Sequence, residues 1–218
     1  MKTRVIFWGA GGHAAVCSEL IRVSGHYELA GCLSDPGHEP SVHPALLNFK
    51  LEGPEQLKII RQSGVRHAFV SVGDCAIRLE KGRLLAAAGF ELISLVHPSA
   101  IISSSATLGA GTAVMAGVVV NAHAKIGGQV ILNTACSVDH DCQLADGVHI
   151  SPGARLAGRV NVGRAAWVGI GASVRDGVNI GAGSIVGVGA AVIKDVPDKT
   201  VVAGVPARTI KQIYDDRQ

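Results

Sequence analysis

The chain has 218 residues and a formal net charge of +3 at pH 7; charged residues make up 17% of it and aromatic residues 4%. The Lys and Arg residues form no cluster, which argues against a nucleic-acid-binding protein. The sequence has neither a charged-then-apolar leader nor a run of about eighteen apolar residues, so we expect a cytoplasmic protein without membrane contact.

The first part of the chain predicts alternating strands and helices. Apolar runs predict strands at 4–7, 28–33, 67–72 and 91–95, and helical patterns predict helices at 14–23, 54–62 and 76–88. This order is typical of a small parallel sheet with helices on its faces, a Rossmann-like α/β domain.

Candidate ligand residues follow three of these strands. They are the loop Gly9, Ala10, Gly11, Gly12 and His13 after the first strand, Asp35 after the second and Gly73 after the third. Parallel sheets bind ligands at the carboxyl ends of their strands, where glycines admit a phosphate and a carboxylate accepts from ribose or base donors. The features together indicate a nucleotide, although the glycine loop alone could be a tight turn. The sheet is too small for NAD, which argues against an oxidoreductase.

A six-residue repeat fills the second part of the chain. Sixteen consecutive hexads run from Ile102 to Pro197; the first residue of each is aliphatic, and the fifth, from Ala106 to Val196, is small or short-branched. Both positions are expected to point inward. Such a repeat is typical of a parallel β-helix, in which three hexads make one coil of eighteen residues.

The two patterns divide the chain into three predicted parts. Residues 1–96 form a Rossmann-like domain, residues 97–203 form an all-β parallel β-helix, and residues 204–218 leave it as a tail or short cap.

Three histidines of the β-helix fall at outward positions of their hexads. They are His123, His140 and His149, and we expect all of them on the surface. Gly158 follows His140 by one coil on the same side, which predicts space for a flat substrate group between them. Ordinary surface histidines are one alternative, and a zinc site like that of γ-type carbonic anhydrases is another. Their spacings of seventeen and nine residues do not resemble that ligand pattern, so we expect no metal.

Six segments together resemble the bacterial sugar O/N-acyltransferases. They are GAGGH at 9–13, LVHPS at 95–99, ILNT at 131–134, SVDHDC at 137–142, GARLAG at 153–158 and AGVPA at 203–207. This family includes sialic-acid O-acetyltransferases and UDP-4-amino-sugar N-acetyltransferases of the bacillosamine pathway. The resemblance covers nearly the whole chain and implies a left-handed β-helix of hexapeptide repeats.

The resemblance also implies a role for each matching residue. His140 takes the place of the general base. Asp141 takes the place of the acidic residue that orients this base, a position where Glu is usual in the family. Gly158 takes the place of the backbone donor that faces the thioester carbonyl. His149, Ile170 and Val188 match positions that line the acetyl-CoA groove together with Gly158. In the small domain, the matching pocket for the nucleotide of the sugar comprises Gly9, Ala10, Gly11, Gly12, His13, Asp35 and Gly73.

The implied function is that of an acyltransferase in glycan biosynthesis. We expect an acetyl-CoA-dependent N-acetyltransferase that acts on the 4-amino group of a UDP-linked 4-amino-4,6-dideoxy sugar. The family implies a homotrimer with active sites between protomers. One alternative is an O-acetyltransferase for sialic acid or another nucleotide sugar. The alternative from a different class is a non-catalytic trimeric scaffold that binds a nucleotide sugar.

Overall fold

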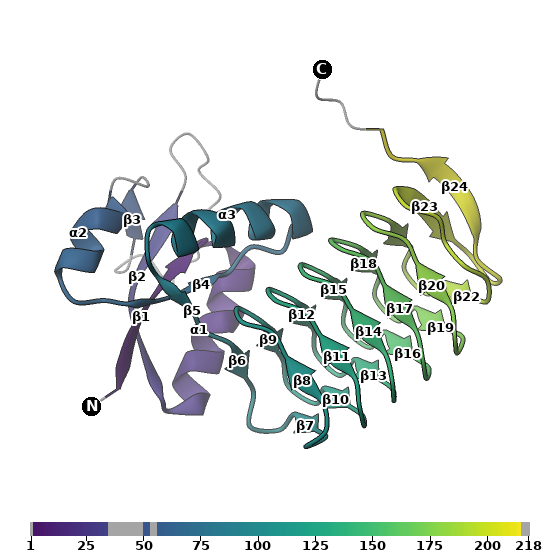
Figure 1. The fold of residues 1–218 in the computed structure, drawn as a ribbon, viewed down its shortest axis with the longest axis horizontal. Coiled ribbons are helices and arrows are strands. Elements are labelled where there is room, and N and C mark those ends of the chain that lie inside the picture. The colour runs from purple at the N-terminus through teal and green to yellow at the C-terminus, as the bar shows by residue number, and fades with distance from the viewer. Residues whose placement is uncertain (1, 35–49, 53–55, 215–218) are drawn as a thin grey trace. The chain divides into compact units, whose positions relative to one another are not determined.

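The computed structural model describes residues 2–34, 50–52 and 56–214 (Figure 1). The chain divides into two compact units, residues 1–98 and 99–218. None of the helices in these described ranges has the length and apolarity needed to cross a membrane.

The first unit contains a parallel five-stranded sheet in the order β3-β2-β1-β4-β5. Its elements are β1 (Thr3–Trp8), α1 (Gly12–Ser24), β2 (Tyr27–Ser34), β3 (Lys50–Glu52), α2 (Gln56–Gln62), β4 (His67–Val70), α3 (Cys75–Ala87) and β5 (Glu91–Leu92), followed by β6 (Leu95–Val96). The α/β class is confirmed. The sequence did not predict β3, and the single strand expected at 91–95 is two short strands.

Local residues explain where the helices of this unit begin and end. Gly25 ends α1 in the left-handed conformation, with φ 72°. Asp74 caps the start of α3, since its Oδ1 accepts the Ile77 N–H at 2.8 Å. Asp74 directly follows the candidate ligand residue Gly73, whereas Gly25 lies at the opposite end of α1 from the glycine loop.

The strand order reverses between β1 and β4, which lie side by side although far apart in sequence. Ser71 extends this pairing, because its N–H donates to the Trp8 carbonyl at 2.9 Å. The loops after β1 and β4 therefore meet at the switch point where open α/β sheets bind ligands.

The second unit is a parallel β-helix with three faces. Face I consists of β7 (Ile101–Ile102), β10 (Val119–Val120), β13 (Ser137–Val138), β16 (Arg155–Leu156), β19 (Ser173–Val174) and β22 (Ala191–Val192). Face II consists of β8 (Thr107–Leu108), β11 (Lys125–Ile126), β14 (Gln143–Leu144), β17 (Asn161–Val162) and β20 (Asn179–Ile180). Face III includes β9 (Ala113–Val114), β12 (Ile131–Leu132), β15 (His149–Ile150), β18 (Trp167–Val168), β21 (Ile185–Val186), β23 (Thr200–Ala203) and β24 (Arg208–Gln212).

The expected period of eighteen residues is confirmed. Val120 pairs with Val138, and Val138 pairs with Leu156, one coil further on. The first and fifth residues of the hexads are buried from Thr112 onward, whereas the three that precede it, Ile102, Ala106 and Leu108, are half-buried at the start of the first coil.

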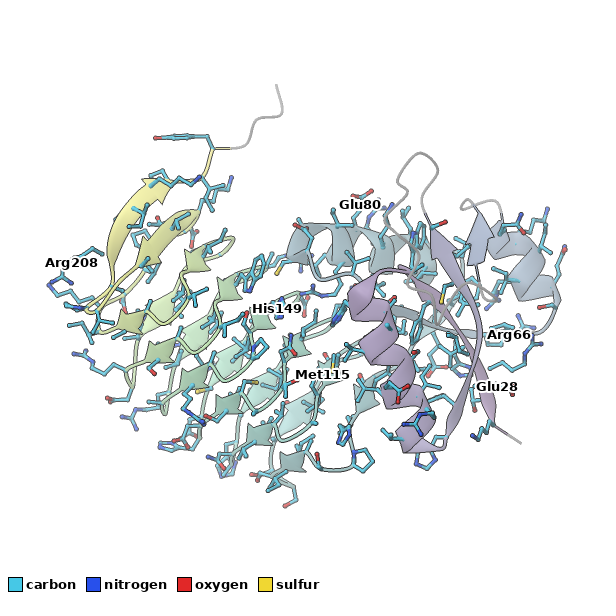
Figure 2. All side chains as sticks on the ribbon, turned by 180° about the vertical axis from the view of Figure 1, so that it is seen from behind. Glu28, Arg66, Glu80, Met115, His149 and Arg208 are labelled. Atoms are coloured by element: carbon cyan, nitrogen blue, oxygen red, sulfur yellow. The ribbon has the colours of Figure 1, made fainter. Side chains whose placement is uncertain are left out.

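The sequence predicted an unbroken repeat to Pro197, but the structure shows a shorter last coil. Ile180 forms a bridge with Val196, and Ile185 pairs with Val201, so the last coil returns after sixteen residues instead of eighteen. Beyond this coil, β24 runs antiparallel to β23 with all of its residues exposed. Arg208 begins β24, and Figure 2 shows it at that end of the β-helix.

Candidate active site

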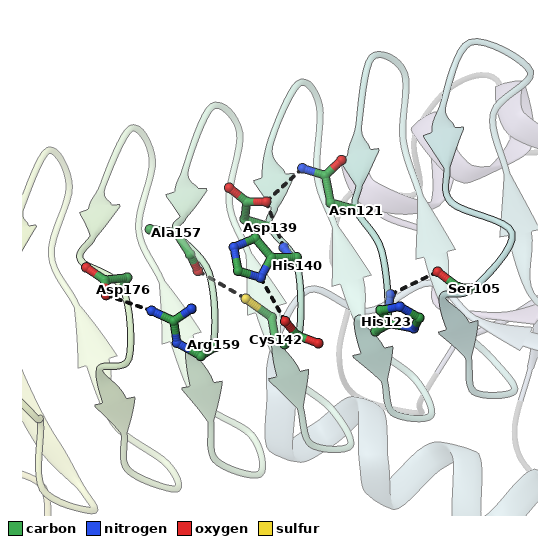
Figure 3. A network of polar contacts seen from close by, with 10 residues as sticks. Ser105, Asn121, His123, Asp139, His140, Cys142, Ala157, Arg159 and Asp176 are labelled. Atoms are coloured by element: carbon green, nitrogen blue, oxygen red, sulfur yellow. Dashed lines mark hydrogen bonds and ion pairs between the residues drawn. The ribbon is translucent and has the colours of Figure 1, made fainter.

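His140 and Asp141 lie on the corner between faces I and II, in the turn from β13 to β14. Figure 3 shows His140 on this corner. The His140 Nδ1 is 2.8 Å from the Asp141 Oδ2, and both side chains are about half-exposed. The aspartate therefore reaches the imidazole although it is shorter than a glutamate. This hydrogen bond, assisted by the nearby charges of His140, His123 and Arg159, holds the pKa of the Asp141 carboxyl below its usual range.

Gly158 lies on the same corner, one coil after His140. A Cβ built at Gly158 would be 2.5 Å from the His140 Nε2 and 2.6 Å from its Cε1, so only glycine admits the imidazole at this position. The space expected for a flat substrate group between the two residues is thus filled by the ring itself. No acceptor in the described part of the chain takes the Gly158 N–H, which leaves that donor available to a ligand.

On the same corner, residues other than glycine occupy turn positions with positive φ, where the turns on other corners often have glycine. His123, Asp141 and Arg159 occupy equivalent turn positions in three successive coils, with φ of 60°, 59° and 58°. Left-handed backbone at residues other than glycine costs about 1–2 kcal/mol and is enriched at functional sites. Their side chains thus stand next to one another along the corner, as a stack of one carboxylate between two basic groups.

His149 is not on the surface, contrary to the sequence-based expectation. It is only 8% exposed, because its ring stacks on that of Trp167 with centroids 5.3 Å apart and planes 5° apart. Its Nε2 is 3.2 Å from the Asn133 amide nitrogen, and the Trp167 indole donates to the Ser151 hydroxyl at 2.7 Å. His149 and Trp167 are paired on face III one coil apart, and the contact between their rings buries His149. Figure 2 shows where His149 lies on the β-helix.

Ile170 and Val188 lie on a different corner from His140. Both follow strands of face III, in the turns that lead to face I, and they are 54% and 73% exposed. His140 and Gly158 follow strands of face I. One chain therefore does not bring the expected acetyl-CoA residues and the expected base to the same corner.

The glycine loop of the first unit packs against the end of β4. Gly9 has φ 117°, and a Cβ there would be 2.7 Å from the Ser71 carbonyl oxygen, so this position requires glycine. The Ser71 hydroxyl donates to the Gly9 carbonyl at 2.9 Å. A Cβ at Gly11, Gly12 or Gly73 would meet nothing within 4 Å, so packing does not explain these glycines.

The remaining expected residues of this pocket have distinct surroundings. Ala10 is buried, and Asp35 lies outside the described residues. His13 is half-buried in the first turn of α1, with its Nε2 3.6 Å from the Cys17 Sγ. Burial, and next the charge of Arg78, lower the pKa of His13 to about 4. His13 is therefore neutral near pH 7 and meets a ligand as a neutral donor or acceptor.

Arg78 is a buried cation that the sequence reading missed. It is 0% exposed, and its Nη1 donates to the carbonyls of Val72, Gly73 and Asp74 at 3.0, 2.8 and 3.3 Å. Helical spacing from Cys75 to Leu85 places Arg78 on the buried stripe of α3, and this signal was available in the sequence. Arg78 thus fixes the loop that contains Gly73.

Comparisons with known proteins identify the family. A family model described as the PglD N-terminal domain matches residues 4–82. The crystal structure of PerB from Caulobacter crescentus, in complex with CoA and GDP-perosamine, is 41% identical; the match covers 97% of this chain and 98% of that chain, with a TM-score of 0.89. The chain belongs to the bacterial sugar O/N-acyltransferase family.

Two curated members of the sugar acyltransferase family match part of the chain. GDP-perosamine N-acetyltransferase from Escherichia coli O157:H7 is 34% identical over 135 residues, 62% of this chain. UDP-N-acetylbacillosamine N-acetyltransferase from Bacillus subtilis (strain 168) is 40% identical over 116 residues, 50% of this chain. The chain spans about half the length of these relatives, 53% and 49%. Family membership agrees with the left-handed β-helix that the resemblance implied, and with the parallel β-helix expected from the hexads.

Metal ligands were not expected at this family's site. Within the described ranges, no group of three or more His, Cys, Asp or Glu side chains is arranged to hold a metal ion. Of the three histidines that raised the zinc alternative, His149 is covered on face III, away from the corner of faces I and II that carries His123 and His140.

Proposed function

We propose that the chain is an acetyl-CoA-dependent N-acetyltransferase that acts on the 4-amino group of a nucleotide-linked 4-amino-4,6-dideoxy sugar. The observation that carries the proposal is the contact of Asp141 with the Nδ1 of His140, which directs the other ring nitrogen toward Gly158. PerB has this fold and was crystallised with CoA and GDP-perosamine. The curated relatives act on a GDP-linked and a UDP-linked amino sugar by name, so UDP and GDP are both candidate nucleotides.

The proposed reaction is a direct transfer. His140 removes a proton from the sugar amine while the amine nitrogen attacks the thioester carbonyl carbon. The Gly158 N–H stabilises the oxyanion of the tetrahedral intermediate. This intermediate then collapses, the carbon–sulfur bond breaks, and the CoA thiolate leaves and takes up the proton from His140. Asp141 keeps the ring oriented and stabilises its protonated form.

The first experiment is a thiol-release assay with acetyl-CoA and a UDP- or GDP-linked 4-amino-4,6-dideoxy sugar. His140→Ala should lower kcat by about 10²–10⁴, the range for loss of a general base, without lowering Tm, because the side chain is half-exposed. His26→Ala, at an exposed histidine of the first unit, is the matched control and should be as active as the wild type. Undiminished turnover in His140→Ala would disprove the assignment of the base.

The choice of acceptor decides between the alternatives. Release of thiol with hydroxyl acceptors only, such as a sialic acid, would replace the N-acetyltransferase with an O-acetyltransferase. Nucleotide-sugar binding without release from any acceptor would favour the non-catalytic scaffold.

We further propose that the active site forms between protomers of a homotrimer. The separation of Ile170 and Val188 from His140 within one chain supports this, since a neighbouring copy can bring the two corners together. His140→Ala and Val188→Arg should each have strongly reduced activity alone, whereas refolded mixtures should regain activity at sites that combine one intact corner from each chain. Mixtures that stay inactive would contradict a shared site.

A further inference from the structure

Asp139, which directly precedes the candidate base, is bonded from two sides (Figure 3). Its Oδ1 accepts the backbone N–H of His140 at 2.7 Å and the side-chain amide of Asn121 at 2.9 Å. Asn121 occupies the same hexad position one coil earlier, as the pairing of β10 with β13 requires. Asp139 therefore links the turn that carries the base to the neighbouring coil.

The Asp139 carboxylate accepts a backbone N–H that no carbonyl of the described residues accepts. The N–H groups of Asp139 and Asp141 donate to carbonyls of adjacent coils, Leu156 and Ala122, at 3.1 and 3.0 Å. The His140 N–H between them donates to the Asp139 carboxylate instead. Without this acceptor, the backbone at the base would be fixed by its two neighbours alone.

Asp139 also adds charge beside the base. The bond from the His140 N–H, and next that from Asn121, hold the pKa of the Asp139 carboxyl below its usual range, so it is ionised near neutral pH. Among the described residues, the other charged or titratable groups near His140 and Asp139 are Asp141 at the His140 Nδ1, His123 and Arg159 on the coils to either side, and the buried Cys142 thiol. Two carboxylates adjacent to a general base stabilise the imidazolium that forms when it accepts a proton.

We propose that Asp139, held by Asn121, is a positioning residue for His140 that fixes its backbone and keeps a second negative charge next to it. This inference rests on the proposed function, because it requires His140 to be the base. Asp139 acts through His140 and needs no contact with either substrate.

Asp195 provides a matched control at a distance from the base. It accepts the backbone N–H and the side-chain amide of Asn179 at 2.8 and 3.1 Å, and these bonds likewise lower the pKa of its carboxyl. Asp139→Asn and Asp195→Asn thus each remove one negative charge that accepts a backbone N–H and an Asn side-chain amide. Only at Asp139 does the backbone N–H belong to His140, the candidate base.

The experiment measures kcat, both KM values and Tm for the two variants across pH 5–9. Asp139→Asn should lower kcat about 10-fold, a typical effect of residues that orient a functional group, with KM values within about twofold of the wild type. The acidic limb of its kcat/KM profile should move to lower pH, since a fixed negative charge beside the base is lost. Asn121→Ala should act in the same direction but less, and Asp195→Asn should change neither kcat nor the limb. Equal effects of the two Asp→Asn variants, or a lower kcat with an unmoved limb, would overturn the inference.

A second measurement does not depend on turnover. In NMR spectra of the full chain, the amide proton shift of His140 should follow ionisation of Asp139 with a midpoint below the ordinary Asp value of about 3.9, and this titration should vanish in Asp139→Asn. An amide signal that ignores this ionisation would refute the positioning role. Full activity of His140→Ala would instead refute the proposed base, so the two failures are distinguishable.

Discussion

The two units present their candidate residues in opposite environments. On the β-helix, His140 and Asp141 are half-exposed on a corner, and the regular coils beneath them are complete without their side chains. In the first unit, the loops after β1 and β4 are joined by the hydrogen bond from the Ser71 hydroxyl to the Gly9 carbonyl. The buried Arg78 also donates to the carbonyl of Gly73 in the loop after β4. Changes at the first site should therefore affect chemistry with little loss of stability. Changes at the second should cost stability as well.

Of the changes that compare the two units, Gly158→Ala should show the largest effect, a fall in kcat. It should impair the site on the β-helix and leave the first unit intact. The added Cβ would lie 2.5 Å from the His140 Nε2, so the imidazole must move, and a displacement of about 1 Å costs about 100-fold in kcat. The backbone of Gly158 is not left-handed, and the half-exposed ring has room to move, so Tm should stay within a few degrees.

A double-mutant cycle checks that this loss acts through the ring. In a His140→Ala background, Gly158→Ala should cause no further fall in kcat, because the clashing group is gone. A further 100-fold fall would show that Gly158 acts independently of His140.

The hexad register explains why most of the β-helix site could be predicted. Because side chains repeat every eighteen residues, the sequence alone places Gly158 over His140 and the aliphatic residues inside. The same register puts Trp167 one coil after His149, so the burial of His149 was predictable from packing between outward neighbours. The shortened last coil was not predictable, because Val196 fits the inward pattern in either register.

The first unit was less predictable because its contacts are not periodic. The sequence marks Gly9 and Gly73 as loop glycines, but it does not reveal that a Cβ at Gly9 would clash with Ser71, whereas a Cβ at Gly73 would meet nothing within 4 Å. The Nη1 of Arg78 donates to backbone carbonyls, which carry no sequence signal. Contacts between distant loops depend on the three-dimensional arrangement of the strands.

Gly9→Ala should show the second-largest effect, this time on stability. Alanine at φ 117° is strained, and its Cβ would lie 2.7 Å from the Ser71 carbonyl oxygen, so we expect a loss of about 2–3 kcal/mol in the free energy of unfolding. Gly25→Ala is the control, since Gly25 also has positive φ but open space around it, and should cost about 1 kcal/mol. Denaturant unfolding measures both. Equal losses would show that the contact with Ser71 adds nothing.

The smallest effect should come from His13 and should depend on pH. Its pKa is lowered to about 4 in the folded chain, against about 6.5 when unfolded, so the unfolded chain binds more protons between these values. Stability due to the neutral ring is therefore present above pH 6.5 and is lost as the pH falls toward 4. For this half-buried ring we expect a loss of about 1 kcal/mol between pH 7 and pH 5, after allowing for solvent screening. His13→Gln should reduce this loss, whereas His26→Gln, at an exposed histidine, should not. An equal dependence of the unfolding free energy on pH in both variants would show that burial in the first unit does not keep His13 neutral.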